Sequence, residues 1–321
     1  MSTPSLRWPR LGLGCASLGT PELSDADAER VIVAAIARGV RFFDVAPLYG
    51  GGLAEERLGR ALAALPRERY VLCTKVGVTR PYGQPPTPPG ATRRRQFDVW
   101  DYSAAATRAS VETSLERLRT DRLDVVHLHD AENHLDRCLD AYAELVRLRD
   151  AGVVGAIGIG SNVVAPVQHL IDRARFDAFL LAGRYTLLDA SGRALIEAAH
   201  ARGIAVVAGG VFNSGVLAAW PQPAPTYGYE PADGRIVERA AKIAAIGARH
   251  DVPIAALALQ FVLANAAITT VLIGARTVAE FDANVAATEC RIPRACWSEL
   301  ADAGVIPADT PGLHRHLLDC A

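Results

Sequence analysis

The sequence Arg41-Phe-Phe-Asp-Val-Ala-Pro-Leu-Tyr49 has the features of a buried strand that breaks into a loop. We expect a strand over Val40–Val45, with Asp44 where this strand ends and Tyr49 in the loop that follows. A carboxylate buried at a strand end needs a partner, because an unpaired buried charge is very costly. The position of Asp44 therefore directs the search to a basic residue on a neighbouring strand.

Lysine is rare in this chain, and one lysine lies in an apolar strand. Of the 34 Lys and Arg residues, only Lys75 and Lys242 are lysine. Lys75 lies in the strand predicted over Tyr70–Val76, whereas Lys242 lies in a polar helix. Arginine cannot be deprotonated, whereas a buried lysine is a compact charge with a tunable pKa. We therefore expect Lys75 to be the partner of Asp44.

Strands and helices alternate along most of the chain. Eight segments are predicted as strands, beginning near residues 11, 40, 70, 123, 155, 177, 204 and 269, and helices separate nearly all of them. Eight such units predict an α/β fold, a (β/α)8 TIM barrel that forms a single domain over residues 1–321 with inserted loops at about 79–102 and 218–233. An open doubly wound sheet is the alternative, although no Gly-x-Gly-x-x-Gly follows a strand.

The composition is that of an ordinary globular protein. The 321 residues are 50% hydrophobic and 21% charged, with a formal net charge of -1. The sequence has no long run of like charge, so it does not predict a nucleic acid or an anionic membrane as a partner. No apolar run is long enough to span a bilayer. The first ten residues lack the apolar segment of a signal peptide, so we expect a cytoplasmic protein. No oligomeric state is predicted.

In a barrel of this kind, polar residues at the carboxyl ends of the strands form the active site. Asp44 ends the second predicted strand, Lys75 lies near the end of the third, and His129 ends the fourth. A nearby ammonium favours the phenolate and lowers the pKa of a tyrosine. We therefore predict that Tyr49 is the general acid/base on an oxygen whose carbon exchanges a hydride, that Asp44 holds Lys75, and that His129 orients this oxygen.

The pair His127 and His129 permits a second interpretation, the zinc centre of a barrel hydrolase. The fifth and sixth predicted strands supply no further histidine, and the eighth ends at Gly274 without a carboxylate. The six cysteines contain no Cys-x-x-Cys either. We therefore predict no metal and place His127 in the barrel interior.

Glycine-containing loops follow the seventh and eighth predicted strands. Gly209 and Gly210 lie in the first of these loops, and the second, Gly274–Thr277, precedes a helix. Backbone amides at glycines and at a helix N-terminus bind phosphate, and barrels commonly place phosphate at these loops. Both loops together fit a nucleotide diphosphate.

The chain resembles the aldo-keto reductase family from about Leu11 to Ala287. The matching motifs are Leu-Gly-Leu-Gly at 11–14, Phe-Asp-x-Ala-x-x-Tyr at 43–49, Thr-Lys at 74–75, Asp-x-x-x-x-His at 124–129, Gly-x-Gly-Ser-Asn at 158–162 and Gly-x-Arg…Glu…Asn at 274–284. The resemblance implies an NAD or NADP cofactor and a tetrad of Asp44, Tyr49, Lys75 and His129.

The resemblance also implies how the cofactor is held. Ser161 and Asn162 would hold the nicotinamide carboxamide, and Glu280 near the adenosine ribose would repel a 2′-phosphate, so NAD is favoured although Arg276 argues for NADP. The predicted cofactor residues are Gly14, Cys15, Ala16, Asp44, Ser161, Asn162, Gly209, Gly210, Asn213, Ser214, Gly274, Arg276, Glu280 and Asn284. Two positions depart from the family: Gly209 stands where many members stack an aromatic ring, and Ala182 where many have a glutamine.

Segments 182–189 and 212–217 resemble the branch that oxidises sugars at the anomeric carbon, which includes L-fucose, D-threo-aldose and L-galactose dehydrogenases. This implies an aldose of the L-fucose, D-arabinose or L-galactose class as substrate, oxidised at C1 to the lactone. Pyridoxal 4-dehydrogenase activity, general aldehyde or ketone reduction, and a non-catalytic regulatory subunit are the alternatives. The predicted substrate contacts are Tyr49, His129, Leu48 and Trp100, and the walls of the pocket are segments 79–102 (with Phe97, Trp100 and Tyr102) and 221–233.

Overall fold

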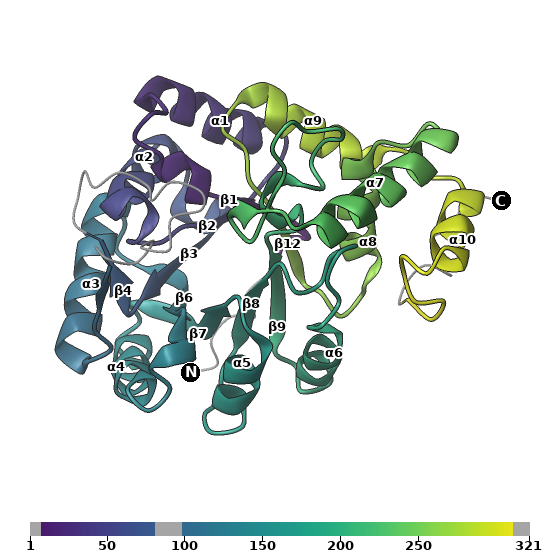
Figure 1. Cartoon of the computed structure of the whole chain (residues 1–321). Coiled ribbons are helices and arrows are strands. Elements are labelled where there is room, and N and C mark those ends of the chain that lie inside the picture. Colours follow the sequence, from purple (N-terminus) through teal and green to yellow (C-terminus); the bar gives the residue numbers. More distant parts are fainter. Residues whose placement is uncertain (1–7, 81–97, 311–321) are drawn as a thin grey trace.

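The computed structural model describes residues 8–80 and 98–310. Eight parallel strands close into a barrel in the order β1-β12-β9-β8-β7-β6-β3-β2, with helices around it (Figure 1). The strands are β1 (Leu11–Gly14), β2 (Phe42–Asp44), β3 (Val71–Val76), β6 (Leu123–His129), β7 (Val154–Ser161), β8 (Ala178–Ala182), β9 (Ala205–Gly209) and β12 (Thr270–Ile273). The closed sheet confirms the predicted barrel over the open doubly wound alternative.

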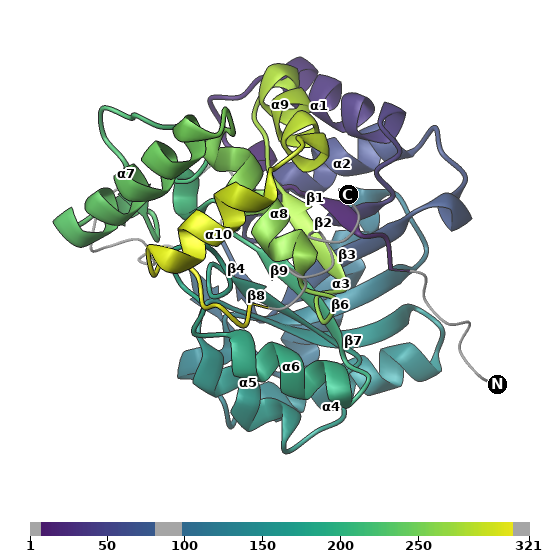
Figure 2. The same cartoon turned by 90° about the vertical axis from the view of Figure 1, so that its right-hand side faces the viewer.

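Ten α-helices are described, and most of them connect successive barrel strands. They are α1 (Asp25–Ala37), α2 (Leu53–Leu62), α3 (Ala104–Leu118), α4 (Cys138–Asp150), α5 (Val164–Ile171), α6 (Arg193–Ala201), α7 (Gly234–Arg249), α8 (Ile254–Ala264), α9 (Val278–Glu289) and α10 (Arg294–Asp302). The serine before α1 caps it, since Ser24 Oγ accepts from the Asp27 backbone N–H at 3.1 Å. Outside the ring, α10 lies against α7 (Figure 2).

No single helix within 8–80 and 98–310 is long and apolar enough to cross a membrane; α7 and α8 reach that length and composition only as a pair bent by 97°.

Alternation along the strands determines which side chains enter the barrel. Phe42 on β2 and Cys73 on β3 belong to a small apolar cluster that lines the barrel interior. Side chains two residues apart on a strand share a face. Asp44 and Lys75 therefore point inward as well, one layer closer to the carboxyl ends of the strands.

Both inserted segments contain short antiparallel strand pairs that the sequence analysis did not predict. One pair is β4 (Val78–Thr79) with β5 (Val99–Trp100), and the other is β10 (Thr226–Tyr227) with β11 (Glu230–Pro231). The remainder of the first segment, 81–97, including Phe97, lies outside the described residues. Between β6 and α4 the chain forms a 3-10 turn over Ala131–Asn133, and α4 begins at Cys138.

Candidate active site

Lys75 is the partner that the buried Asp44 requires. Its Nζ donates to Asp44 Oδ1 at 2.7 Å and to the Val45 carbonyl at 2.9 Å. Neither side chain of the ion pair is more than 4% exposed. The carboxylate raises the pKa of the Lys75 ammonium above its ordinary value even though burial alone lowers it, so Lys75 is charged at neutral pH.

Tyr49 and His129 complete a compact group with this ion pair. The Lys75 Nζ lies 4.8 Å from the centre of the Tyr49 ring. The rings of Tyr49 and His129 meet edge to face, with centroids 6.0 Å apart and planes at 89°. The structure thus brings all members of the predicted tetrad together at the carboxyl ends of β2, β3 and β6.

Glycines fix the loop that carries Tyr49. The 3-10 turn η2 (Tyr49–Gly52) begins at the tyrosine, and Gly50 adopts a left-handed φ of 66°. A side chain on Gly50 would collide with the backbone of Gly19 in the loop after β1. Because the two loops touch through their backbones, the position of Tyr49 is set by the barrel.

Tyr102, which the sequence analysis placed in a wall of the pocket, contacts the backbone of the site. Its side chain is buried, and its hydroxyl donates to the backbone carbonyl of His129 at 2.5 Å. The ring packs directly on Gly77, where any side chain would overlap it. Tyr102 therefore holds the backbone of the predicted catalytic histidine.

The expectation that Lys75 lowers the pKa of Tyr49 below its ordinary value is wrong for the protein described here. Burial raises the pKa of the Tyr49 phenol, and the opposing effect of the Lys75 ammonium is smaller. Tyr49 is therefore protonated at neutral pH. It is ready to donate a proton, and it must first lose one before it can accept.

His127 lies in the barrel interior, as predicted. It is fully buried, and neither ring nitrogen has a hydrogen-bond partner among the described residues. Burial and the nearby Lys75 charge lower the pKa of His127 to about 3, so the ring is neutral. In the part of the chain that the structure describes, no three His, Cys, Asp or Glu side chains are arranged to hold a metal ion.

The loop after β9 provides a concave run of backbone N–H groups. Gly210, Asn213, Ser214 and Gly215 all have positive φ in the left-handed region. Asn213 is buried, with its amide nitrogen 3.3 Å from the Gly183 carbonyl and its Oδ1 without a hydrogen-bond partner among the described residues. Such turns bind anions, and the orphaned oxygen would accept from a ligand hydroxyl. The loop therefore fits the phosphates and sugar of a nucleotide.

The loop after β12 lies beside this one, because Val271 of β12 pairs with Ala208 of β9. Three predicted adenosine residues gather at the start of α9. The Arg276 backbone N–H donates to Glu280 Oε2 at 2.8 Å, and Asn284 Nδ2 donates to the Gly274 carbonyl at 3.1 Å. The positive end of α9 and the glycine loop are therefore adjacent, as a bound diphosphate requires.

The predicted nicotinamide residues lie at the end of β7, and further predicted cofactor residues lie at the end of β1. Asn162 is exposed, whereas Ser161 is buried and its hydroxyl donates to Glu132 Oε2 at 3.0 Å. At β1, Cys15 is buried with its backbone N–H on the Asp44 carbonyl at 2.8 Å, and Ala16 is exposed. Gly14 pairs in register with Asp44, so these positions lie next to the tetrad.

Two of the predicted substrate residues, Leu48 and Trp100, are partly exposed. Trp100 packs against His134, with ring centroids 5.2 Å apart. Because His134 also contacts Tyr102, which holds His129, the β4–β5 pair is connected to the site through aromatic contacts.

Comparison with known proteins identifies the family of this chain. The model of the aldo/keto reductase family matches residues 10–304. The chain belongs to the aldo-keto reductase family. It is 39% identical over 313 residues to D-threo-aldose 1-dehydrogenase from Pseudomonas sp., covering 93% of this chain and 95% of that protein. It is 36% identical over 322 residues to pyridoxal 4-dehydrogenase from Microbacterium luteolum, with coverages of 92% and 94%.

The fold comparison agrees. An aldo-keto reductase from Bacillus halodurans, solved in its holo form, superposes with a TM-score of 0.73 at 26% identity, over 98% of this chain and 97% of that one. This aldo-keto reductase is therefore an NAD(P)-dependent oxidoreductase, with a nucleotide as its cofactor. The loops after β9 and β12 are the parts of this chain that fit such a group.

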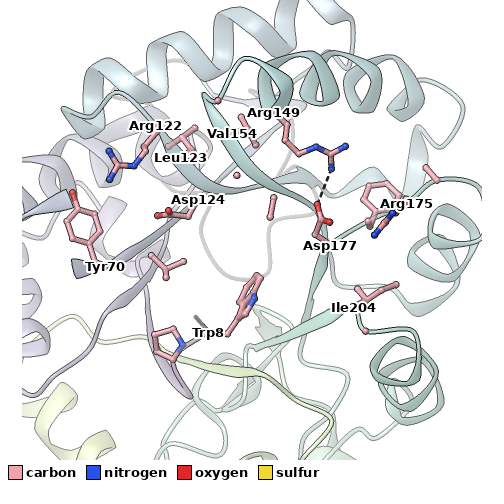
Figure 3. A pocket seen from close by; sticks show the side chains of 18 of the residues that line it. Trp8, Tyr70, Arg122, Leu123, Asp124, Arg149, Val154, Arg175, Asp177 and Ile204 are labelled. Carbon is pink, nitrogen blue, oxygen red and sulfur yellow. Dashed lines mark hydrogen bonds and ion pairs between the residues drawn. The ribbon is translucent and has the colours of Figure 1, made fainter. Parts of the chain in front are cut away.

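A large cavity of this aldo-keto reductase lies at the other end of the barrel. It has a volume of about 1520 Å³ and is lined at the amino ends of the strands by residues such as Tyr70, Asp124 and Asp177 (Figure 3). None of the tetrad residues lines it. Because catalysis in this fold takes place at the carboxyl ends of the strands, the size of this cavity does not indicate the active site.

The sequence analysis missed two residues that contact the predicted nicotinamide turn. Glu132 accepts from Ser161, and Arg184 donates to the Asn162 carbonyl at 2.6 Å. Arg184 stands two residues after Ala182, the position where many members have a glutamine. A charged residue so close to that departure was the available signal.

Proposed function

We propose that this enzyme oxidises an aldose at C1 to the lactone, with Tyr49 as the group that takes up the proton. The observation that carries the proposal is the position of Lys75, which is ion-paired to Asp44 at 2.7 Å and lies 4.8 Å from the Tyr49 ring. The similarity to D-threo-aldose 1-dehydrogenase supports an aldose as substrate.

The roles follow from charge and position. Tyr49 takes the proton from the anomeric hydroxyl, and the Lys75 ammonium stabilises the phenolate that must exist beforehand. Asp44 keeps Lys75 charged and in place, and His129 hydrogen-bonds the reacting oxygen. A nicotinamide, when bound, accepts the hydride that leaves the anomeric carbon, so that the C–H and O–H bonds break and the lactone carbonyl forms.

We propose NAD as the preferred cofactor. Glu280 places an exposed carboxylate at the start of α9, with Oε1 3.8 Å from Arg276 Nη2. This carboxylate would repel a 2′-phosphate and accept from a 2′-hydroxyl. The partial neutralisation of Arg276 by Glu280 weakens the contrary argument for NADP.

Pyridoxal 4-dehydrogenase activity is the second candidate, supported by the 36% identical relative. A pyridoxal ring is flat and aromatic, whereas a sugar presents hydroxyl groups on a puckered ring. Partly exposed Trp100 at the mouth would stack on either of them. Because Trp100 does not distinguish the two substrates, the site residues indicate only the oxidation of an alcohol or hemiacetal. The choice of substrate rests on the relatives.

The test is a screen for cofactor reduction. Purified protein is mixed with NAD or NADP and with L-fucose, D-arabinose, L-galactose or pyridoxal, and the formation of reduced cofactor is followed by absorbance. Simple aldehydes are mixed with NADH or NADPH instead, and the loss of reduced cofactor is followed. We expect an aldose with NAD to give a kcat/KM about tenfold or more above that of pyridoxal, and a hydroxamate assay to detect the lactone. A preference for pyridoxal would establish the second candidate, and cofactor binding without turnover of any compound would favour a regulatory role.

A further inference from the structure

A charged side chain holds the turn that contains Asn162. Arg184, in the loop after β8, donates from Nε to the backbone carbonyl of Asn162 at 2.6 Å. Its Nη1 pairs with Asp189 Oδ2 at 2.8 Å. The guanidinium is 35% exposed and the carboxylate 16%, so the ion pair is partly shielded from water. Arg184 therefore connects the loop after β7 with the loop after β8.

This turn lies next to the catalytic tetrad. His129 at the end of β6 pairs in register with Gly160 of β7, two residues before Asn162. Ser161 between them is buried, and its hydroxyl contacts Glu132 and the backbone N–H of Val163. The Asn162 side chain is exposed. Fixing the Asn162 carbonyl thus fixes the direction in which its amide projects beside the tetrad.

The same network reaches the loop expected at the pyrophosphate. The Tyr227 hydroxyl of β10 lies 3.4 Å from Asp189 Oδ2. The hairpin of β10 and β11 is itself bound to Ser214, whose carbonyl accepts from Thr226 at 2.8 Å. One hydrogen-bonded frame therefore joins the loops after β7, β8 and β9, with Arg184 and Asp189 at its centre.

We propose that Arg184 is a positioning residue for the nicotinamide half of the cofactor, acting through the Asn162 turn. The inference rests on the proposed role of Asn162 as a carboxamide ligand. The planar guanidinium donates in two directions at once, to a carbonyl and to a carboxylate, which a lysine cannot reproduce with the same geometry. Where Ala182 provides no side-chain amide, the rigid Asn162 turn compensates for the lost contact.

The test compares two ligands that differ only in the nicotinamide. The affinities of NAD and of ADP-ribose are measured by calorimetry for the wild type and for Arg184→Met. We expect Arg184→Met to weaken NAD binding about 10- to 100-fold, as for the loss of a charge-assisted hydrogen bond, and to change ADP-ribose binding less than about threefold. Arg184→Lys should recover only part of the loss.

Three further variants make the result decisive. Arg202→Met removes an arginine that pairs with Asp172 at 3.0 Å at the amino end of the barrel, away from the site, and should leave both affinities unchanged. Asp189→Asn should weaken NAD selectively but less than Arg184→Met, and it serves if the latter does not fold. In an Asn162→Ala background, Arg184→Met should have little further effect, because both changes remove the same interaction.

Equal losses of NAD and ADP-ribose, or no loss of either, would overturn the positioning role. Additive effects of Arg184→Met and Asn162→Ala would also overturn it. None of these measurements uses a sugar, so they are independent of the substrate proposal. If no aldose is oxidised but the selective loss of NAD persists, the substrate proposal fails and the positioning role stands.

Discussion

The two ends of the barrel both carry buried or half-buried charges, but they use them differently. At the amino end, Asp124 Oδ2 accepts from Arg67 and from the Leu72 backbone N–H, both at 2.7 Å. At the carboxyl end, Asp44 gives Lys75 one oxygen, while Oδ2 is buried without a hydrogen-bond partner among the described residues. Asp124 at the amino end is thus paired within the chain, whereas Asp44 at the carboxyl end retains an unused acceptor.

This difference in pairing says more about where a ligand binds than does the volume of the cavity at the amino end. The amino end contains the large cavity, yet its carboxylates are paired with neighbouring groups of the chain. Asp177 accepts from Arg149 of α4 at 3.3 Å (Figure 3) and from the Ile157 backbone N–H of β7 at 2.9 Å. Buried polar groups are normally paired, so an unpaired one in a native fold calls for an explanation. For Asp44 at the carboxyl end, we infer that the explanation is a ligand.

Removal of the phenol at the carboxyl end is the most severe test of whether this end of the barrel is catalytic. Tyr49→Phe keeps the ring but removes the proton carrier, so we expect kcat to fall by about 10²- to 10⁴-fold. Cofactor affinity, measured by calorimetry, should stay within about threefold, since the ring still fills its place. A variant that turns over at a near-normal rate would remove Tyr49 from the mechanism.

The pH dependence of oxidation should show the cost of burying that phenol. Because burial raises the pKa of Tyr49, the phenolate that accepts the proton is the minor form at neutral pH, and it increases about tenfold for each pH unit below that pKa. We expect kcat/KM for oxidation to rise from pH 7 into the alkaline range. The measurement is a set of initial rates at constant ionic strength.

Lys75→Met is the matched variant for this profile. Without the ammonium, nothing opposes the effect of burial on the Tyr49 pKa, so the rise should move to higher pH and the rate at neutral pH should fall. A profile that is flat, or that falls as the pH increases, would show that Tyr49 does not limit the reaction in the manner proposed.

At the amino end, we expect a substitution to reduce stability and to leave catalysis unchanged. Asp124→Asn removes the charge that binds Arg67 but keeps an acceptor near the Leu72 N–H, so we expect a loss of about 1 to 3 kcal/mol in the free energy of unfolding. Urea denaturation measures the loss, and kcat should be unchanged at temperatures where the variant is folded. A large fall in kcat with intact stability would mean that the amino end takes part in function.

Local pattern was sufficient to predict the barrel and the group of residues at its mouth. The alternation of strands and helices, and a strand that contains one of only two lysines in the chain, pointed to Lys75 and Asp44. Contacts with backbone carbonyls could not be predicted in this way. Tyr102 binds the carbonyl of His129, and Arg184 binds that of Asn162. Because every residue carries the same backbone carbonyl, the sequence does not indicate which one a side chain will bind. The sign of the Tyr49 pKa shift also depended on burial, which spacing does not reveal.

The backbone contact between Gly19 and Gly50 has a consequence for altering substrate scope. Because a side chain on Gly50 would meet the Gly19 carbonyl, and one on Gly19 the Tyr49 carbonyl, neither position tolerates enlargement without displacing the loop that carries Tyr49. Engineering of substrate scope should therefore begin at Leu48 or at Trp100, the predicted substrate contacts that are partly exposed.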